Sequence, residues 1–276
     1  MSVAEAGVAF EVRGADNPTP LLFVPPLGRG RASWASQVAA LEDSYRCVLF
    51  DPRGIGRSKD VACAGYSAAT IADDARHVLD ESGVEQAHVV GWSLGAAAAM
   101  LLALQHPGRV ASLALLTPWA RTDAHLARAF EMLRDLVVHA SPESAEVATM
   151  WHILSREAVN AAGTHLLDGA RSDVADPGYP AASTMVDYLD SGAELDVLDR
   201  LGDLAMPTLV VGGAEDRLVD TAHARATAAA IPGADLRVLT GPGATHALPV
   251  ERADEVNALL RTFLTAHDTS VGAATT

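Results

Sequence analysis

The run of residues 91–95, Gly-Trp-Ser-Leu-Gly, constrains the fold of this chain more than any other segment. It follows the apolar, strand-like residues 87–90 and precedes the Ala- and Leu-rich, helix-like residues 96–105. A turn leading directly from a strand into a helix is so tight that its central residue is strained and its side chain stands clear of neighbouring atoms. A Cβ atom on either flanking residue would collide with the turn or the adjacent strand, which explains the two glycines. The sequence therefore predicts a strand–turn–helix unit with the Ser93 hydroxyl at its centre.

Short apolar runs alternate with amphipathic stretches along most of the chain. The apolar runs are residues 8–12, 21–24, 46–50, 87–90, 110–116, 208–211 and 236–239. This alternation is typical of an α/β fold with a mostly parallel central sheet and flanking helices. The 276 residues, of which 49% are hydrophobic, suit one large domain or a core with an insertion and argue against a disordered chain.

The pattern changes in the middle of the chain. Helix-like stretches such as Ala124–Val138 and Ser144–Ala161 follow one another without a strand between them. We interpret this region as a helical cap inserted into the core, and the Ala-, Thr- and Gly-rich C-terminus as loosely packed. The predicted organisation is a core of residues 1–117 and 201–266, a helical cap of residues 118–200 and a flexible tail of residues 267–276.

Charge and composition limit the kinds of molecule that this chain can bind. A net charge of −15 argues against nucleic acid and anionic membranes. The longest apolar stretch, residues 96–104, is too short to span a bilayer, and no basic segment followed by an apolar one marks a secretory signal. The only cysteines, Cys47 and Cys63, form no metal-binding pattern and fit a reducing cytoplasm. We expect a cytoplasmic monomer or homodimer that acts on a small molecule.

Two later residues are placed to activate Ser93. A serine hydroxyl is a poor nucleophile unless a base takes its proton and a third group orients that base. Asp216 and His246 each follow their own apolar run, and carboxyl ends of parallel strands gather at one edge of a sheet. The sequence predicts a catalytic triad of Ser93, Asp216 and His246, with Glu215 as the alternative acid.

Further motifs on both sides of the predicted cap support a family assignment. They are the D-x-R-G-x-G-x-S turn at residues 51–58, the segment from Pro207 to Asp216, and the His246–Glu251 loop with Asn257. With the triad, these motifs make the chain resemble the α/β-hydrolase fold superfamily, specifically its capped serine hydrolases of esterase or lactonase type. The resemblance implies the chain order nucleophile, acid, histidine and requires no metal or other cofactor. The cap resembles no family that we can name.

The same resemblance implies two backbone donors for the oxyanion of an acyl-transfer intermediate. One is the N–H of Leu94 at the start of a helix. The second comes from the loop after residues 21–24, where this chain has Pro25-Pro26 in place of the family's His-Gly. Pro26 has no N–H, so we assign the second donor to Leu27. A cis bond between the prolines is one way to shape this loop, and Gly28 would let it approach the substrate.

The aromatic residues in and beside the predicted cap have two interpretations. They line an apolar substrate pocket, or they form the cap's own core. These residues are Trp119, Trp151, Tyr179 and Tyr188. The predicted substrate pocket consists of Trp119, Trp151 and Tyr188 from this group, together with Trp92 of the Ser93 turn. We expect Arg53 to brace its own turn rather than bind substrate. The scattered histidines of the cap show no metal-ligand spacing.

The identity of the nucleophile selects the chemistry. Dehalogenases and epoxide hydrolases of this family use an aspartate at the equivalent turn, whereas Ser93 suits attack on an acyl carbon. The leading hypothesis is hydrolysis of a small apolar ester or lactone through an acyl-enzyme. The alternatives are a biosynthetic tailoring enzyme (cyclase, thioesterase or C–C/acyl-cleaving), a cofactor-free perhydrolase, and a non-catalytic ligand-binding protein.

Overall fold

A single eight-stranded sheet forms the centre of the computed structural model, which describes residues 2–3 and 7–268. Its strand order is β1-β2-β4-β3-β5-β6-β7-β8; β1 and β2 are antiparallel to their neighbours, and the remaining pairs are parallel. The strands are β1 (Ser2–Val3), β2 (Ala9–Arg13), β3 (Pro20–Val24), β4 (Arg46–Phe50), β5 (Ala87–Trp92), β6 (Val110–Leu116), β7 (Thr208–Gly213) and β8 (Asp235–Leu239). The predicted α/β fold with a mostly parallel sheet is confirmed, although β2 begins one residue later than expected and β1 was not predicted.

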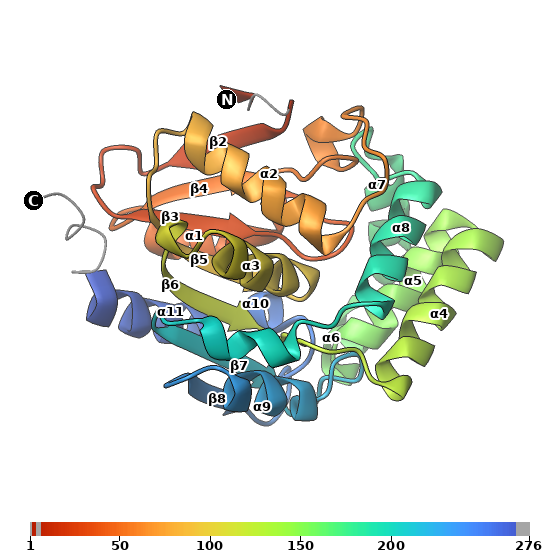
Figure 1. Cartoon of the computed structure of the whole chain (residues 1–276). Helices are drawn as coiled ribbons and strands as arrows, with labels where there is room; N and C mark the ends of the chain where they lie inside the picture. Colours follow the sequence, from red (N-terminus) through yellow and green to blue (C-terminus); the bar gives the residue numbers. More distant parts are fainter. Residues whose placement is uncertain (1, 4–6, 269–276) are drawn as a thin grey trace, which may run out of the picture.

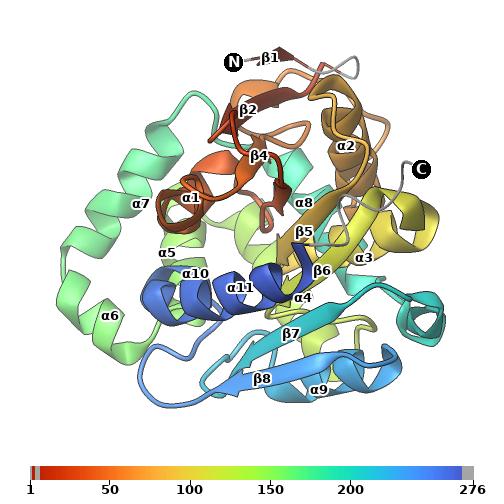
Figure 2. The same cartoon turned by 90° about the vertical axis from the view of Figure 1, so that its left-hand side faces the viewer.

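Helices cover both faces of the sheet. On one face pack α1 (Ala35–Leu41), α10 (Leu248–Glu251) and α11 (Ala253–His267); on the other pack α2 (Ala68–Glu81), α3 (Leu94–Gln105) and α9 (Thr221–Ala230). Figure 2 shows the strands between α1 and α11 on one side and α2 and α3 on the other. Because alternate side chains of a strand point to opposite faces, the buried strands contribute to two separate apolar cores.

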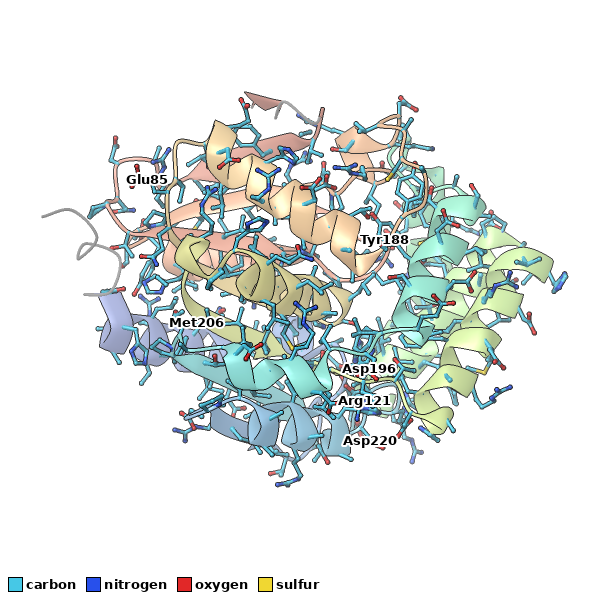
Figure 3. The ribbon with its side chains drawn as sticks, in the orientation of Figure 1. Glu85, Arg121, Tyr188, Asp196, Met206 and Asp220 are labelled. Carbon is cyan, nitrogen blue, oxygen red and sulfur yellow. The ribbon has the colours of Figure 1, made fainter. Side chains whose placement is uncertain are left out.

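Five α-helices lie between β6 and β7, followed by a short 3-10 helix at Leu198–Asp203. They are α4 (Ala124–His139), α5 (Pro142–Ile153), α6 (Arg156–Ala162), α7 (His165–Ala175) and α8 (Ala182–Ala193), here called the α4–α8 segment. They gather on one side of the molecule, beside the sheet (Figure 1). Arg121 and Asp196, at the two ends of the segment, form an isolated antiparallel bridge and an ion pair of 2.9 Å; Figure 3 shows them side by side. The segment thus leaves and re-enters the core at one place.

One predicted helix of this segment is wrong. The structure replaces a continuous helix over 144–161 with α5 and α6, which are separated at Leu154 and Ser155. The Ser155 side chain caps α6 by accepting from the Ala158 N–H, and the Ser155 N–H donates to Glu251 Oε1 at 2.9 Å. Glu251 lies almost a hundred positions away from Ser155 in the sequence, so the residues around Ser155 gave no sign that the helix is interrupted there.

The C-terminal helix α11 extends through His267, so the first residue of the predicted flexible tail is helical. Residues 269–276 of that tail lie outside the described residues. Within the described part of the chain, no helix combines the length and apolar character needed to cross a membrane.

Because α3 lies very close to β3, a methyl group added at Gly95 should lower the stability of the protein. A Cβ there would overlap the carbonyl oxygens of Val24 and Pro25, which are backbone atoms and cannot rotate away. We expect Gly95→Ala to lower the free energy of unfolding by about 1–3 kcal/mol, the usual cost of overpacking.

The measurement is urea unfolding followed by circular dichroism. Gly108→Ala is the matched control, because no heavy atom lies within 4 Å of a Cβ at Gly108. We expect this control to stay within about 0.5 kcal/mol of the parent protein. Equal stability of the two variants would show that the α3–β3 contact is not tight in solution.

Candidate active site

Ser93 occupies a strained turn between β5 and α3. Its φ of 58° and ψ of −121° lie in a region that residues with a side chain rarely adopt. The Ser93 N–H donates to the Leu116 carbonyl at 2.9 Å, and the Ser93 carbonyl accepts from the first turn of α3. A Cβ at Gly91 would overlap Gly95 and Ala96, so the flanking glycines are needed for this turn. Neighbouring backbone thus holds the serine in place.

Asp216 lies in the loop after β7 and is buried. Its Oδ1 accepts from the N–H groups of Leu218 and Val219, each at 2.9 Å, which leaves Oδ2 for His246 Nδ1 at 2.8 Å. Glu215, the alternative acid, is exposed and contributes only its N–H, which donates to the Ala244 carbonyl at 2.7 Å. The structure therefore brings Asp216, and not Glu215, to the histidine.

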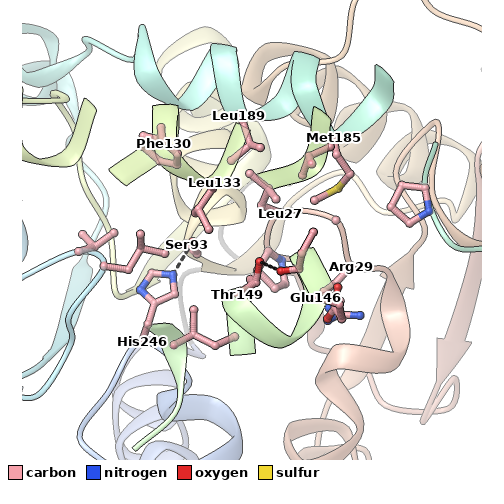
Figure 4. A pocket seen from close by; sticks show the side chains of 18 of the residues that line it. Leu27, Arg29, Ser93, Phe130, Leu133, Glu146, Thr149, Met185, Leu189 and His246 are labelled. Carbon is pink, nitrogen blue, oxygen red and sulfur yellow. Dashed lines mark hydrogen bonds and ion pairs between the residues drawn. The ribbon is translucent and has the colours of Figure 1, made fainter. Parts of the chain in front are cut away.

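His246 connects the acid to the serine. Its Nε2 lies 2.8 Å from Ser93 Oγ (Figure 4), and its ring is almost completely buried. When Nδ1–H donates to Asp216, Nε2 is the nitrogen that accepts from the Ser93 hydroxyl, so one tautomer satisfies both contacts. The loop is held in turn by the Trp92 indole N–H, which donates to the His246 carbonyl at 2.9 Å.

The two predicted oxyanion donors, Leu94 and Leu27, come from α3 and from the loop after β3. Leu94 is the first residue of α3, where a helix has no acceptor of its own for the N–H. Leu27 lines the same cavity as Ser93, in the loop after β3. The Pro25–Pro26 bond is trans, so the cis alternative is wrong. Gly28 has φ +70°, and the group that approaches it is the Met185 thioether of α8, within about 3 Å of a Cβ built there.

A cavity of about 110 Å³ contains the Ser93 and His246 side chains in its wall. The helices α4, α5 and α8 supply much of the remaining wall, as Figure 4 shows for Phe130, Leu133 and Leu189. Its apolar lining includes Pro26, Leu27, Phe130, Leu133, Val137, Ile153, Met185, Leu189, Leu218 and Val219. Side chains of the α4–α8 segment thus line an apolar space next to Ser93.

The predicted pocket aromatics divide into two pairs. Trp92 and Trp119 line the cavity. Trp151 and Tyr188 lie outside it, contrary to the prediction. Trp151 is 52% exposed and packs under the Arg217 guanidinium, 4.7 Å from the ring centre. Tyr188 is buried in the core and donates to the Arg53 carbonyl at 2.9 Å. Both side chains point away from the cavity because the opposite faces of α5 and α8 line it.

Arg53 braces its turn, as expected from the sequence. Its backbone N–H and its Nε donate to the buried Asp74 carboxylate at 3.0 and 2.7 Å. Burial raises the pKa of Asp74, and the hydrogen bonds from Arg53 oppose that rise. The pair ties the turn after β4 to α2 and takes no part in the cavity wall.

Sequence reasoning missed a polar group in the cavity wall. Glu146 of α5 is 7% exposed, pairs with the Arg29 guanidinium, and accepts from the Tyr179 hydroxyl at 3.1 Å. Burial and the nearby Glu146 raise the pKa of Tyr179. Burial opposes the charge of Arg29, but Glu146 and Asp173 offset it, so the pKa of Arg29 is raised. A glutamate on a helix gives no local signal of this pairing, since Arg29 is more than a hundred residues away.

Comparisons with known proteins identify the family. A model described as "alpha/beta hydrolase fold" matches residues 19–252. The chain belongs to the α/β-hydrolase fold family. It is an enzyme of hydrolase type, as its similar proteins also indicate. Among the described residues, no group of three or more His, Cys, Asp or Glu side chains is arranged to hold a metal ion.

Individual relatives extend over nearly the whole chain. A protein of Azorhizobium caulinodans named "Putative carbamate hydrolase RutD" is 31% identical over 260 residues, which is 94% of this chain and 95% of the relative. A hydrolase from Pseudomonas aeruginosa has a similar structure, with a TM-score of 0.81, 26% identity and coverage of 95% of this chain and 97% of its own. Est816, described as an N-acyl homoserine lactone degrading enzyme, has a TM-score of 0.79, 28% identity and coverage of 95% and 99%.

The geometry predicts selective modification of Ser93 by a fluorophosphonate. The Ser93 Oγ displaces fluoride from phosphorus, and His246 takes the hydroxyl proton. We expect one label per chain on Ser93, none in Ser93→Ala, and labelling slowed by a factor of about 10⁴ in Asp216→Asn, as when a triad carboxylate is removed.

Mass spectrometry of the intact and digested protein measures the rate and the site. Glu215→Gln is the matched control, because it neutralises the adjacent exposed carboxylate, and we expect it to label at the parent rate. A parent protein that stays unlabelled at neutral pH would contradict an activated serine, and slow labelling of the control would assign the acid to Glu215.

Proposed function

We propose that this protein is a serine hydrolase that cleaves a small, largely apolar ester or lactone through an acyl-enzyme intermediate. The observation that carries the proposal is the hydrogen-bonded series Asp216–His246–Ser93 in the wall of an apolar cavity. In this proposal the α4–α8 segment is a cap that excludes water and defines the substrate space.

The reaction proceeds in two steps. Ser93 Oγ attacks the acyl carbon while His246 Nε2 takes the hydroxyl proton, and the N–H groups of Leu27 and Leu94 stabilise the oxyanion. The proton on His246 then passes to the leaving alcohol oxygen as the ester bond breaks. In the second step His246 removes a proton from water, and the water oxygen attacks the acyl carbon of the acyl-enzyme. The bond from that carbon to Ser93 Oγ then breaks, His246 returns the proton to Ser93 Oγ, and the carboxylic acid leaves. Asp216 orients the imidazole and stabilises its charged form throughout.

The character of the cavity supports an apolar substrate. Its side chains from α4 and α8 are apolar, and a space of about 110 Å³ accommodates a small acyl or alcohol group. A lactone is an internal ester, so the same steps open its ring without a separate leaving group. Similarity to the lactone-degrading Est816 supports this substrate class.

A carbamate is the second candidate. The relatives named RutD, such as the Azorhizobium protein with 31% identity, are named as putative carbamate hydrolases. A carbamate presents an acyl carbon to the same nucleophile.

A substrate panel separates the two candidates: p-nitrophenyl esters of two to eight carbons, unsubstituted γ- and δ-lactones, and the matched N-alkyl carbamates. We expect the short and medium esters or a lactone to give the highest kcat/KM. Turnover confined to carbamates would favour the second candidate, and no turnover would favour a dedicated biosynthetic role.

Filling the cavity predicts a change in chain-length preference. Leu133 points into the cavity from α4, so Leu133→Trp reduces the space for the acyl group. We expect kcat/KM for p-nitrophenyl hexanoate to fall at least about tenfold, while the acetate ester changes less, because one methylene in an apolar pocket is already worth roughly tenfold or more.

Met132→Trp provides the matched control. Met132 is the preceding residue of the same helix and is 40% exposed, so a tryptophan there adds the same volume outside the cavity. We expect its kcat/KM values to equal those of the parent protein for both esters. An unchanged hexanoate-to-acetate ratio in Leu133→Trp would mean that this cavity does not hold the acyl group.

A further inference from the structure

One part of the catalytic cavity wall carries charge, although most of the lining is apolar. Glu146 and Arg29 both line this wall, across the cavity from His246 (Figure 4). We propose that Glu146 determines substrate specificity by accepting a hydrogen bond from a hydroxyl or amide N–H group that the substrate carries away from its scissile carbonyl. The inference rests on the proposed function, because it names the substrate class of the same cavity.

Three charged side chains, Glu146, Arg29 and Asp173, form a row that leads from the catalytic cavity to a groove outside it. Glu146 lines the catalytic cavity, Asp173 lines a separate groove on the outer side of the wall, and Arg29 lines both. Arg29 pairs with Glu146 and also donates to Asp173 Oδ2 at 3.2 Å. Of the two carboxylates, only Glu146 lines the substrate space, beside the Arg29 guanidinium that pairs with it.

The bonding of Glu146 leaves it able to accept further hydrogen bonds. A carboxylate offers about four acceptor positions, of which Arg29 takes one and the Tyr179 hydroxyl takes another. The row of Glu146, Arg29 and Asp173 carries two negative charges and one positive charge. A neutral donor is thus favoured at this wall, and a substrate with a second carboxylate is repelled.

Stability alone does not account for a charged pair at this position. The Glu146 side chain is 7% exposed and the Arg29 side chain 34%, so the cost of leaving water falls mainly on the carboxylate. Apolar side chains of similar volume often replace a buried ion pair without loss of stability. The remaining cavity lining of α5 is Ala145, Thr149 and Ile153, and the Thr149 hydroxyl already donates to the Ala145 carbonyl at 2.9 Å. Among the α5 residues that line the cavity, Glu146 is therefore the one that carries charge. A hydrogen bond from a polar group of a substrate in the cavity explains why position 146 carries a carboxylate.

The test compares matched ligands in the Ser93→Ala protein, where binding is measured without turnover. The ligands are methyl ω-hydroxyalkanoates of four to eight carbons and the methyl esters in which a methyl group replaces each hydroxyl. We expect calorimetry to find one chain length at which the hydroxy ester is preferred. In Ser93→Ala/Glu146→Met we expect that preference to fall about tenfold or more, because Glu146 is a charged acceptor. Monomethyl adipate, which carries a carboxylate, should bind more weakly than either neutral ester.

Two variants separate recognition from a purely structural role. Asp173→Asn, in the Ser93→Ala background, weakens the outer pairing of Arg29 and leaves Glu146 in place, so we expect the hydroxyl preference to remain. The double substitution Arg29→Met/Glu146→Met removes the whole ion pair and leaves no unpaired buried charge. If the protein with Glu146→Met alone does not fold, this double substitution takes its place in the Ser93→Ala background. Loss of affinity for both ligands alike, or no hydroxyl preference at any chain length, would overturn the inference.

The outcome is independent of the proposed reaction. If the parent protein hydrolyses no ester, lactone or carbamate, the proposed function fails, while the ligand preference in the Ser93→Ala protein still decides the role of Glu146. If the parent protein hydrolyses apolar esters but shows no hydroxyl preference, the proposed function stands and this inference fails.

Discussion

The contact between the N-terminus of α3 and the carboxyl end of β3 is the constraint on which the site depends. Gly95 lies so close to the backbone of Val24 and Pro25 that only a hydrogen side chain fits. This contact brings the first turn of α3 beside the loop that contains Leu27. Because Ser93 is the N-cap of the same helix, its strained backbone and the Leu94 N–H are positioned by the packing of a buried helix on the sheet.

The remaining parts of the site attach to this fixed point from different directions. The β7 and β8 loops deliver Asp216 and His246, and Gly213 allows the two loops to pack together, since a Cβ there would overlap the backbone at Ala244. The α4–α8 segment covers the serine from the other side. Arg29 joins the two regions, because it follows the loop of Leu27 in sequence and pairs with Glu146 of α5. The loop after β3 therefore links the surroundings of Ser93 to the cavity wall formed by α5.

Much of the core was predictable because its signals are local. The seven predicted strands are present within a residue or two, since apolar runs of this length mark strands that are buried on both faces. The break at Ser155 was not predictable, because it depends on a contact with Glu251. The positions of Trp151 and Tyr188 were not predictable either: an aromatic residue on an amphipathic helix is equally suited to a cavity wall, a core or a surface contact.

The sequence by itself determined the α/β fold, the strained turn around Ser93, and Asp216 and His246 as candidate partners in the order of the family. The fold and the turn follow from short-range rules on hydrophobic periodicity and on glycine in tight turns. The two partners follow from their places in loops after strands together with the resemblance to the family. Only the tertiary structure decided which carboxylate meets His246, which aromatic side chains face the cavity, and that Arg29 and Glu146 form a charged wall within it. Those outcomes depend on distances between residues far apart in the chain, which are set when the loops and helices pack around one sheet.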